Sequence, residues 1–482
     1  MSLSNDHLQI IIHFGQNLLK TSCRSTRLAI GILLLSSTIV SAQSIPATIS
    51  ATAKVSTASV KGDADDPAIW IHPTEPAKSV IIGTDKESNG GLYVWNMSGQ
   101  QIHYMPLGSP NNVDVRYGMM IDGQLIDIAV ANSRVNPKQI KVYKINPSNG
   151  TLSDITTDSG ILTPQLDDPY GLCLYQRPFD GAMFVIQSTQ AGAKSNLYQY
   201  RLEDDGKGKV KGTHVRTFGN NTIQQFVEGL VADDELGYVY ASDETHAIRK
   251  FYADPSRGNN NQIVAFALND GISGDREGLA IYHCSNGKGY LLASNQSGTD
   301  VKVYRREGET GDPHKHSLLT TIRTNGSSDT DGLDVTNRPS SAAFPKGFLI
   351  THNAPGKQFR LYAWDEIAQN YLSICTGPTT GVTENPTAQP AAFRLEQNFP
   401  NPFNPITTIS FSLENTATIK LTVANLMGQT VRTLFAGTLS TGNHFVQWDG
   451  RNDTGEIVAT GTYLFRLENG RQVQVKKLLL MR

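Results

Sequence analysis

The sequence predicts an all-β chain, with a six-bladed β-propeller followed by a small C-terminal β-sandwich. Three observations predict it: an acidic or amide marker, an apolar strand that ends in small polar residues, and an aromatic marker, each present six times. Each marker returns after about 50 residues, and a period of that size is typical of a closed ring of β units. No helical pattern of about 10 to 15 residues alternates with the strands, which argues against a barrel of βα units.

The first marker is an acidic or amide residue at the start of a short apolar strand. It occurs in Asp65-Asp66-Pro67-Ala68-Ile69, Asn112-Val113-Asp114-Val115, Asp167-Asp168-Pro169-Tyr170-Gly171-Leu172, Glu228-Gly229-Leu230, Asp275-Arg276-Glu277-Gly278-Leu279 and Asp329-Thr330-Asp331-Gly332-Leu333. If the marker has the same place in each unit, all six face one common axis. Two carboxylates 4 Å apart repel by roughly 4 kcal/mol at an effective dielectric of 20, so a ring of them needs cations. The pattern predicts a site for several calcium ions.

The second and third markers follow the first in every unit. The apolar strands with polar ends are Val80–Asp85, Ile128–Ser133, Phe184–Ser188, Tyr238–Asp243, Tyr290–Asn295 and Phe348–Asn353. The aromatic markers are Leu92–Trp95, Ile140–Tyr143, Leu197–Tyr200, Ile248–Phe251, Val301–Tyr304 and Leu361–Trp364. Turn signals such as Asn149-Gly150 follow the aromatic marker, where a hairpin to a fourth strand would begin. Four strands in each of six units predict a propeller over residues 47–375.

The N-terminal residues 1–42 are predicted to be a leader and secretory signal peptide. The apolar run Leu28–Val40 follows Arg24 and Arg27, and small residues come directly after it. A single membrane anchor is the alternative, but about 13 apolar residues are short for a span of about 20. We therefore expect no stable transmembrane segment.

Beyond the propeller, residues 376–392 form a linker rich in Pro, Thr and Gly. Residues 393–482 contain alternating strands such as Thr408–Leu413 and Ile419–Val423, and these predict the β-sandwich.

Charge and cysteine content narrow the class of protein. A net charge of −2 with 18% charged residues gives no basic field for nucleic acid. Of the four cysteines, Cys23 lies in the leader, which leaves Cys173, Cys284 and Cys375. This odd, widely spaced set is interpreted as packing residues and not as a disulfide framework. We expect a monomer.

Residues 60–370 resemble the β-propeller phytases. The motifs that carry this resemblance are DDPAIWIHP from Asp65, NNVDVRY from Asn111, EGLVADDELG from Glu228, EGLAIY from Glu277, GKGYLLASNQ from Gly287 and SDTDGLDV from Ser328. The resemblance implies a calcium-dependent enzyme that hydrolyses the phosphomonoesters of phytate, myo-inositol hexakisphosphate, with phytate or calcium phytate as substrate. It also implies that a metal-activated water attacks the phosphorus.

The same resemblance implies roles for individual residues. The residues that would position the water are Glu228, Glu277 and Asp275. The calcium ligands at the mouth would be Asp65, Glu228, Asp275, Glu277, Asp331 and Gln296, and those of structural calcium Asp66, Asp329 and Asp334. The phosphate-binding residues would be Lys86, Arg134 and Tyr170, with Glu244 beside them. The family usually has two adjacent lysines where this chain has Lys86-Glu87.

Residues 393–482 resemble the sorting domain of the Bacteroidetes-type secretion system, which is related to the immunoglobulin-like domain of flagellar hook capping proteins. The resemblance implies secretion machinery as a partner. It also implies that the chain is exported and then either released or attached to the cell surface.

Two other functions remain open at the level of the sequence. One is a calcium-binding surface propeller without turnover. The other is a propeller hydrolase of a different ester, such as a lactone, which would not need Lys86 and Arg134. The sequence contains neither an Arg-His-Gly-x-Arg stretch nor a Gly-x-Ser-x-Gly elbow, so the common covalent nucleophiles of hydrolases are not indicated.

Overall fold

The computed structural model describes residues 44–482 apart from 179, 191–195, 220–221, 260, 286, 376–392, 399–400, 402, 405–406, 414, 440–441, 470–471 and 482. The predicted leader and signal peptide (1–42) and the predicted linker (376–392) lie outside the described residues. In the described part, no helix is long and apolar enough to cross a membrane. The only α-helix in this part, α1, spans Trp364–Ala368, so the prediction of an all-β chain is confirmed.

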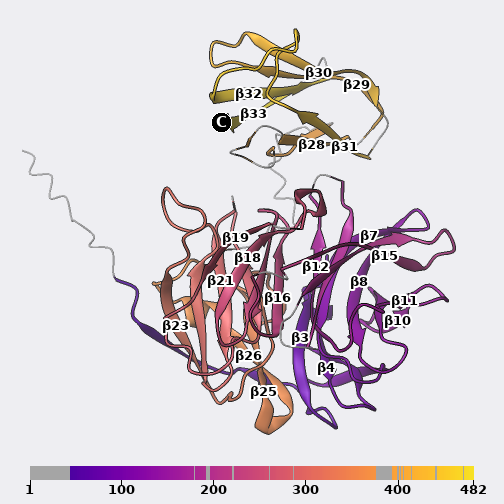
Figure 1. Cartoon of the computed structure of the whole chain (residues 1–482), viewed down its shortest axis with the longest axis vertical. Coiled ribbons are helices and arrows are strands. Elements are labelled where there is room, and N and C mark those ends of the chain that lie inside the picture. Colours follow the sequence, from indigo (N-terminus) through magenta and orange to yellow (C-terminus); the bar gives the residue numbers. More distant parts are fainter. Residues whose placement is uncertain are drawn as a thin grey trace, which may run out of the picture. The chain divides into compact units, whose positions relative to one another are not determined.

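Six sheets of mainly antiparallel strands follow one another from Thr48 to Ala363 (Figure 1). The first three sheets contain β3 (Ala64–Trp70), β4 (Val80–Asp85), β5 (Gly91–Asn96) and β6 (Gln101–Pro106); β7 (Val113–Ile121), β8 (Gln124–Ser133), β9 (Gln139–Ile145), β10 (Leu152–Asp154) and β11 (Ile161–Leu162); and β12 (Pro169–Gln176), β13 (Met183–Thr189), β14 (Leu197–Asp204) and β15 (Val210–Phe218). The next three contain β16 (Val227–Asp233), β17 (Tyr238–Asp243), β18 (Ala247–Tyr252) and β19 (Gln262–Phe266); β20 (Leu279–His283), β21 (Gly289–Asn295), β22 (Asp300–Arg305), β23 (Leu318–Asn325) and β1 (Thr48–Thr52); and β24 (Leu333–Thr336), β25 (Phe348–Asn353), β26 (Gln358–Ala363) and β2 (Val55–Ser56). The short 3-10 helices are η1 (Pro76–Lys78), η2 (Pro255–Arg257) and η3 (Ala354–Gly356).

The sixth sheet takes its fourth strand from the other end of the chain. Strand β2 pairs antiparallel with β26, with Val55 opposite Leu361. The preceding strand β1 pairs parallel with β23 of the fifth sheet. The N-terminal segment therefore joins the fifth and sixth sheets. The repeat predicts that each unit supplies its own four strands, and for this sheet that prediction is wrong.

The first strands of the six sheets contact one another in chain order, and β24 also contacts β3. Hydrophobic clusters fill the space between neighbouring sheets, because successive side chains of a strand point to opposite faces. In β4, for example, Ile81 belongs to the cluster shared with the sixth sheet, and Ile82 belongs to the cluster shared with the second. The aromatic marker contributes to this packing, since the ring of Trp95 meets Phe359 edge to face at 5.6 Å. These contacts bring together the strand starts that carry the acidic marker.

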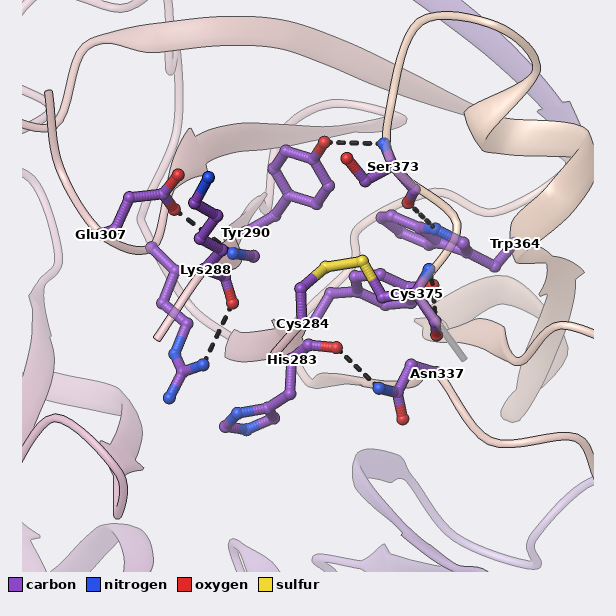
Figure 2. Close-up of a disulfide and its surroundings, with 12 residues drawn as sticks. His283, Cys284, Lys288, Tyr290, Glu307, Asn337, Trp364, Ser373 and Cys375 are labelled. Atoms are coloured by element: carbon purple, nitrogen blue, oxygen red, sulfur yellow. Dashed lines mark hydrogen bonds between the residues drawn. A yellow bond between two sulfur atoms is a disulfide. The ribbon is translucent and has the colours of Figure 1, made fainter. Parts of the chain in front are cut away.

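Cys284 and Cys375 form a disulfide, with Cα atoms 5.2 Å apart (Figure 2). This corrects the interpretation of both as packing residues, which rested on an odd number of cysteines; Cys173 is the buried, unpaired one. The bond ties the end of the described segment 371–375 to the residue after β20. The same segment is held by Tyr290, whose hydroxyl accepts a hydrogen bond from the Ser373 N–H at 2.7 Å.

Residues from Phe393 onward form two sheets that share one core. One contains β27 (Phe393–Leu395), β28 (Thr407–Leu413) and β31 (Gly442–Trp448). The other contains β30 (Thr430–Leu439), β29 (Ala417–Ala424), β32 (Gly461–Glu468) and β33 (Val473–Leu480). Both sheets contribute to a single hydrophobic cluster around Trp448. Along these strands apolar side chains alternate with polar ones, so each sheet has one apolar face. The two apolar faces pack together, which explains why this region folds as two layers.

Candidate functional site

Carboxylates from four sheets meet at the starts of their first strands. Lys86 links two of them, since its Nζ lies 2.6 Å from Asp65 Oδ1 and 3.4 Å from Asp331 Oδ2. Glu228 and Glu277 are close enough for their carboxyl groups to share a hydrogen bond. These residues are spread from position 65 to position 331 of the sequence, and the repeat brings them together.

Glu228 is the most fully held of these carboxylates. The hydroxyl of Tyr170 donates a hydrogen bond to its Oε2 at 2.7 Å, and the side-chain amide of Asn111 donates to its Oε1 at 2.7 Å. Burial opposes ionisation of this group, but hydrogen bonds from Glu277, Tyr170 and Asn111 together with the charge of Lys86 outweigh it and lower the pKa of Glu228. Glu228 is therefore held as a carboxylate in a fixed orientation.

Three carboxyl groups near Glu228 have pKa values raised above their usual range. Burial, and after it the charges of Glu228 and Asp331, raise the pKa of Asp65 well above its usual range. Burial and the charge of Glu228 likewise raise the pKa of Glu277. Burial, Asp275 and Glu228 raise the pKa of Glu244 to about 8. Additional positive charge near these carboxyl groups would lower their pKa values and favour their ionised form.

Two of these groups also have unused oxygen atoms. Asp65 Oδ2 and Glu277 Oε2 are buried and have no hydrogen-bond partner among the described residues. Buried polar atoms are nearly always paired, so unpaired carboxylate oxygens indicate room for a further ligand. The donors of the cluster are oxygens, which hard cations such as Ca²⁺ prefer. The residues therefore fit calcium, although no group of three or more Asp, Glu, His or Cys side chains within the described ranges already has the spacing of a metal site.

The remaining predicted residues lie at different distances from this cluster. Gln296 Nε2 donates to Asp331 Oδ1 at 3.0 Å, and Asp275 is near enough to Glu244 to raise its pKa. Arg134 follows the end of β8, and its guanidinium has no hydrogen bond or ion pair to another described residue. Asp329 has a left-handed backbone, with φ of 47°, and its carboxylate makes no such contact in the described part either.

Asp66 and Asp334 lie on the wall of a cavity of about 290 Å³ lined by the first strands. Asp66 Oδ2 accepts a hydrogen bond from the Val113 N–H at 3.1 Å, and Asp334 Oδ2 accepts one from the Ile69 N–H at 2.8 Å. Burial raises the pKa of Asp334 to about 7. The two predicted structural ligands are thus neighbours inside the ring of strands, and Asp329 is not placed with them by any described contact.

A set of side chains at the ends of the second strands holds the segments that carry the acidic markers. Each accepts hydrogen bonds from backbone N–H groups shortly before the first strand of its own sheet, at 2.7–3.3 Å across the set. The six residues are Asp85, Asn132, Thr189, Asp243, Asn295 and Asn353. Five of these residues belong to the repeat marker predicted from the sequence, which assigned them no such role, and Thr189 directly follows the marker of the third unit. Asn111 was also missed as a site residue, and only its place beside Asn112 in the marker pointed to it.

Glycines next to the acidic markers permit the close approach of neighbouring first strands. A Cβ atom on Gly171, Gly229, Gly278 or Gly332 would lie within 2.7 Å of a backbone oxygen on the next sheet's marker segment. The tightest case is Gly229, where the Cβ would lie 1.7 Å from the carbonyl oxygen of Glu277. The Glu-Gly-Leu and Asp-Gly-Leu motifs therefore combine a charged group with the space that lets its neighbour come near.

Gly229→Ala is expected to destabilise the protein by about 1–3 kcal/mol, because the β16 and β20 segments must move apart. Urea unfolding should show a lower midpoint. Gly437→Ala is the matched control, since its Cβ would lie 3.3 Å from the nearest atom, a ring carbon of Phe435. Equal unfolding midpoints for Gly229→Ala and the unchanged protein would contradict the close-packed ring.

Comparison with known proteins agrees with this fold and site. The family model for phytase matches residues 20–376, and that for the FlgD immunoglobulin-like domain matches residues 404–472. The chain is 38% identical over 316 residues to a 3-phytase of Bacillus subtilis (strain 168), an alignment that covers 64% of this chain and 81% of that protein. All-β sheets with an acidic mouth and this family match define a hydrolase. The chain belongs to the β-propeller phytase family, and the resemblance of its C-terminal region to the immunoglobulin-like domain of flagellar hook capping proteins is confirmed over residues 404–472.

Proposed function

We propose that the chain is a secreted, calcium-dependent phytase that hydrolyses the phosphomonoesters of myo-inositol hexakisphosphate at the mouth formed by Asp65, Glu228, Glu277 and Asp331. The observation that carries the proposal is a buried set of carboxylates with unpaired oxygens and raised pKa values, beside a lysine. Such a site attracts divalent cations first and, once loaded, a polyanion. The substrate has both features that the site needs, namely many phosphate oxygens and a compact ring.

Each residue has a distinct part in this proposal. Calcium would be held by Asp65, Asp275, Glu277, Asp331 and Gln296 with Glu228, while Asp66, Asp334 and Asp329 would serve structural ions. Bound calcium would neutralise phosphate oxygens and make a bound water a better nucleophile.

Glu228 and Glu277 would orient the attacking water in line with the leaving oxygen, and the fixed geometry of Glu228 suits that part. Arg134 would grip a phosphate with two parallel hydrogen bonds, and its guanidinium has no described competitor. Lys86 would act as a point charge, and Tyr170, whose hydroxyl proton is donated to Glu228, would line the phosphate site beside it. Glu244 would lie beside these groups, where burial already raises its pKa to about 8.

We also propose that the six sheets close into a six-bladed propeller over residues 47–375, followed by a linker (376–392) and an immunoglobulin-like sorting domain (393–482). The contact of β24 with β3 and the hydrophobic cluster shared by the sixth and first sheets support closure. Release from the cell or attachment to its surface is supported by the disulfide, since disulfides persist in oxidising compartments.

The assay that tests the function is inorganic phosphate release from calcium phytate, with and without a chelator. Chelator-sensitive release is expected from the unchanged protein. Glu228→Gln should lower kcat on the order of 100-fold, because the neutral amide no longer holds the cation and water. Glu309→Gln, in an exposed ion pair with Lys315, is the matched control and should leave kcat unchanged. Calcium binding without phosphate release would instead support a non-catalytic propeller, and ester cleavage restricted to lactones would support the other alternative.

A further inference from the structure

Asn132 lies one layer behind the mouth and does not reach its surface. It is on β8, its side chain is 0% exposed, and its two amide atoms serve two different sheets. The Oδ1 atom accepts hydrogen bonds from the N–H groups of Asn111 at 2.8 Å and Asn112 at 3.3 Å. The Nδ2 group donates to the backbone carbonyl of Tyr170 on the next sheet.

The two groups that Asn132 holds are the two donors that fix Glu228. Asn111 donates to Oε1 of Glu228 and Tyr170 donates to Oε2, each at 2.7 Å. Four hydrogen bonds therefore form a closed loop from Asn132 through Asn111 and Glu228 to Tyr170 and back. A displacement of Asn132 moves both donors at once, whereas loss of either donor alone leaves the other in place.

In other sheets a separate residue, one position before the strand end, donates to the next sheet, and it also accepts from its own marker segment, as Thr84 does from the Asp66 N–H at 3.0 Å and Ser294 from the Gly278 N–H at 2.8 Å. In the first sheet, Asp85 accepts from the marker segment, and Thr84 donates to the Asn111 carbonyl of the next sheet at 2.9 Å. In the fifth sheet, Asn295 accepts and Ser294 donates to the Asp331 carbonyl at 2.9 Å. In the second sheet, Asn132 performs both parts, and its partners Asn111 and Tyr170 are the two donors to Glu228. One side chain therefore controls the orientation of the Glu228 carboxylate.

We propose that Asn132 is the positioning residue for Glu228, and that it sets the orientation of this carboxylate toward both calcium and the attacking water through Asn111 and Tyr170. The inference rests on the proposed function of Glu228. It assigns no contact between Asn132 and substrate. Partners one layer behind a ligand typically change metal affinity or activity by about 10–100-fold when they are removed.

The first experiment measures kcat, KM and calcium affinity for Asn132→Ala. The expected result is a kcat about 10–100-fold lower, a KM for phytate changed less than about 2-fold, and calcium binding by calorimetry weaker by about 10-fold. Gln199→Ala is the matched control, because Gln199 is equally buried, accepts from Arg216 and donates to the Ala253 carbonyl of the next sheet, and neither bond involves a residue that contacts Glu228. Equal effects of the two variants on kcat and calcium affinity would overturn the proposal.

The second experiment is a double-mutant cycle with Tyr170→Phe, which removes one donor to Glu228. If Asn132 acts through Tyr170, Asn132→Ala costs clearly less kcat in the Tyr170→Phe background than alone. Full additivity of the two changes would contradict that route.

A milder variant keeps the inference testable if Asn132→Ala does not fold. Asn132→Thr copies Thr189, whose hydroxyl accepts from the Asp168 N–H at 3.3 Å. Its single oxygen stands one bond nearer the backbone than the amide nitrogen, so the variant retains an acceptor for the Asn111 N–H but no longer has the group that reaches the Tyr170 carbonyl. A kcat about 10-fold lower with an unchanged unfolding midpoint is expected. Wild-type kcat and calcium affinity in this variant would overturn the proposal. If the unchanged protein releases no phosphate, the proposed function is wrong. The difference in calcium affinity between Asn132→Ala and the unchanged protein still tests the role of Asn132.

Discussion

Removal of calcium is expected to lower the melting temperature of the propeller region by on the order of 10 °C at pH 7.5. Each ion that binds only the folded state stabilises it by about 4 kcal/mol when free calcium exceeds its Kd a thousandfold. For a domain of this size, a few kcal/mol moves the melting temperature by several degrees. Without the ions, the buried carboxylates at the mouth and in the cavity are left to repel one another.

The effect should be smaller at pH 5 than at pH 7.5. Burial raises the pKa of Asp334 to about 7 and, with neighbouring charges, raises that of Asp65 and Glu277 well above the usual range. A carboxyl group whose folded pKa is raised favours the folded state fully below its unfolded pKa, near 4, and this contribution is lost as pH rises through the folded pKa. The calcium-free protein is therefore most stable in mild acid, and calcium, which binds the ionised form, matters most above about pH 7.

Scanning calorimetry with and without a chelator, at both pH values, measures this. The region from Phe393 onward has its own core and none of the predicted ligands, so its unfolding transition serves as an internal control. A chelator effect of the same size at pH 5 and pH 7.5 would contradict the role given to these carboxylates.

Loss of the disulfide is the second large effect expected. Cys284 and Cys375 are separated by 91 residues in sequence. Opening a loop of that length costs on the order of 4 kcal/mol of unfolding free energy, mainly because the unfolded chain gains freedom. Cys375→Ser should lower the urea midpoint accordingly, even in saturating calcium, because the bond closes the end of the sixth unit onto the fifth sheet.

A reductant supplies the control for this prediction. It should lower the midpoint of the unchanged protein to that of Cys375→Ser and have no effect on Cys375→Ser itself. Aromatic packing remains in both cases, since Tyr282 and Trp364 stack with ring centroids 3.9 Å apart. If Cys375→Ser has the same urea midpoint as the unchanged protein, or if reductant still lowers the midpoint of Cys375→Ser, the prediction is wrong.

The repeat in the sequence was enough to predict which residues meet. Asp65, Glu228, Glu277 and Asp331 are linked in the structure through Lys86 and shared hydrogen bonds, because a fixed marker position in each unit determines where its side chain points. The repeat also predicts the strands, since each apolar segment with a polar end forms the second strand of its sheet. Such information is local to one unit and is repeated six times.

Features that join different units could not be found this way. The pairing of β2 with β26 depends on the two ends of a ring and has no signal in the period. The Cys284–Cys375 bond was missed because the number of cysteines says whether all of them can pair, but not which of them lie close together in the fold. Asn132 was seen only as a strand end, because its second hydrogen bond goes to a backbone carbonyl that any residue at position 170 would offer.

The pairing of the first strands with the last has a consequence for how the chain acquires its shape. Phe359 donates its N–H to the hydroxyl of Thr57 across 302 positions, and no earlier stretch can substitute for that partner. Such distant pairings slow folding, because a long stretch of chain must be ordered before they form. A polypeptide that emerges with its amino end foremost must keep that end unpaired until nearly the whole domain has been made. A partner that binds residues 48–56 before β23 and β26 are made would delay folding without contacting the active mouth.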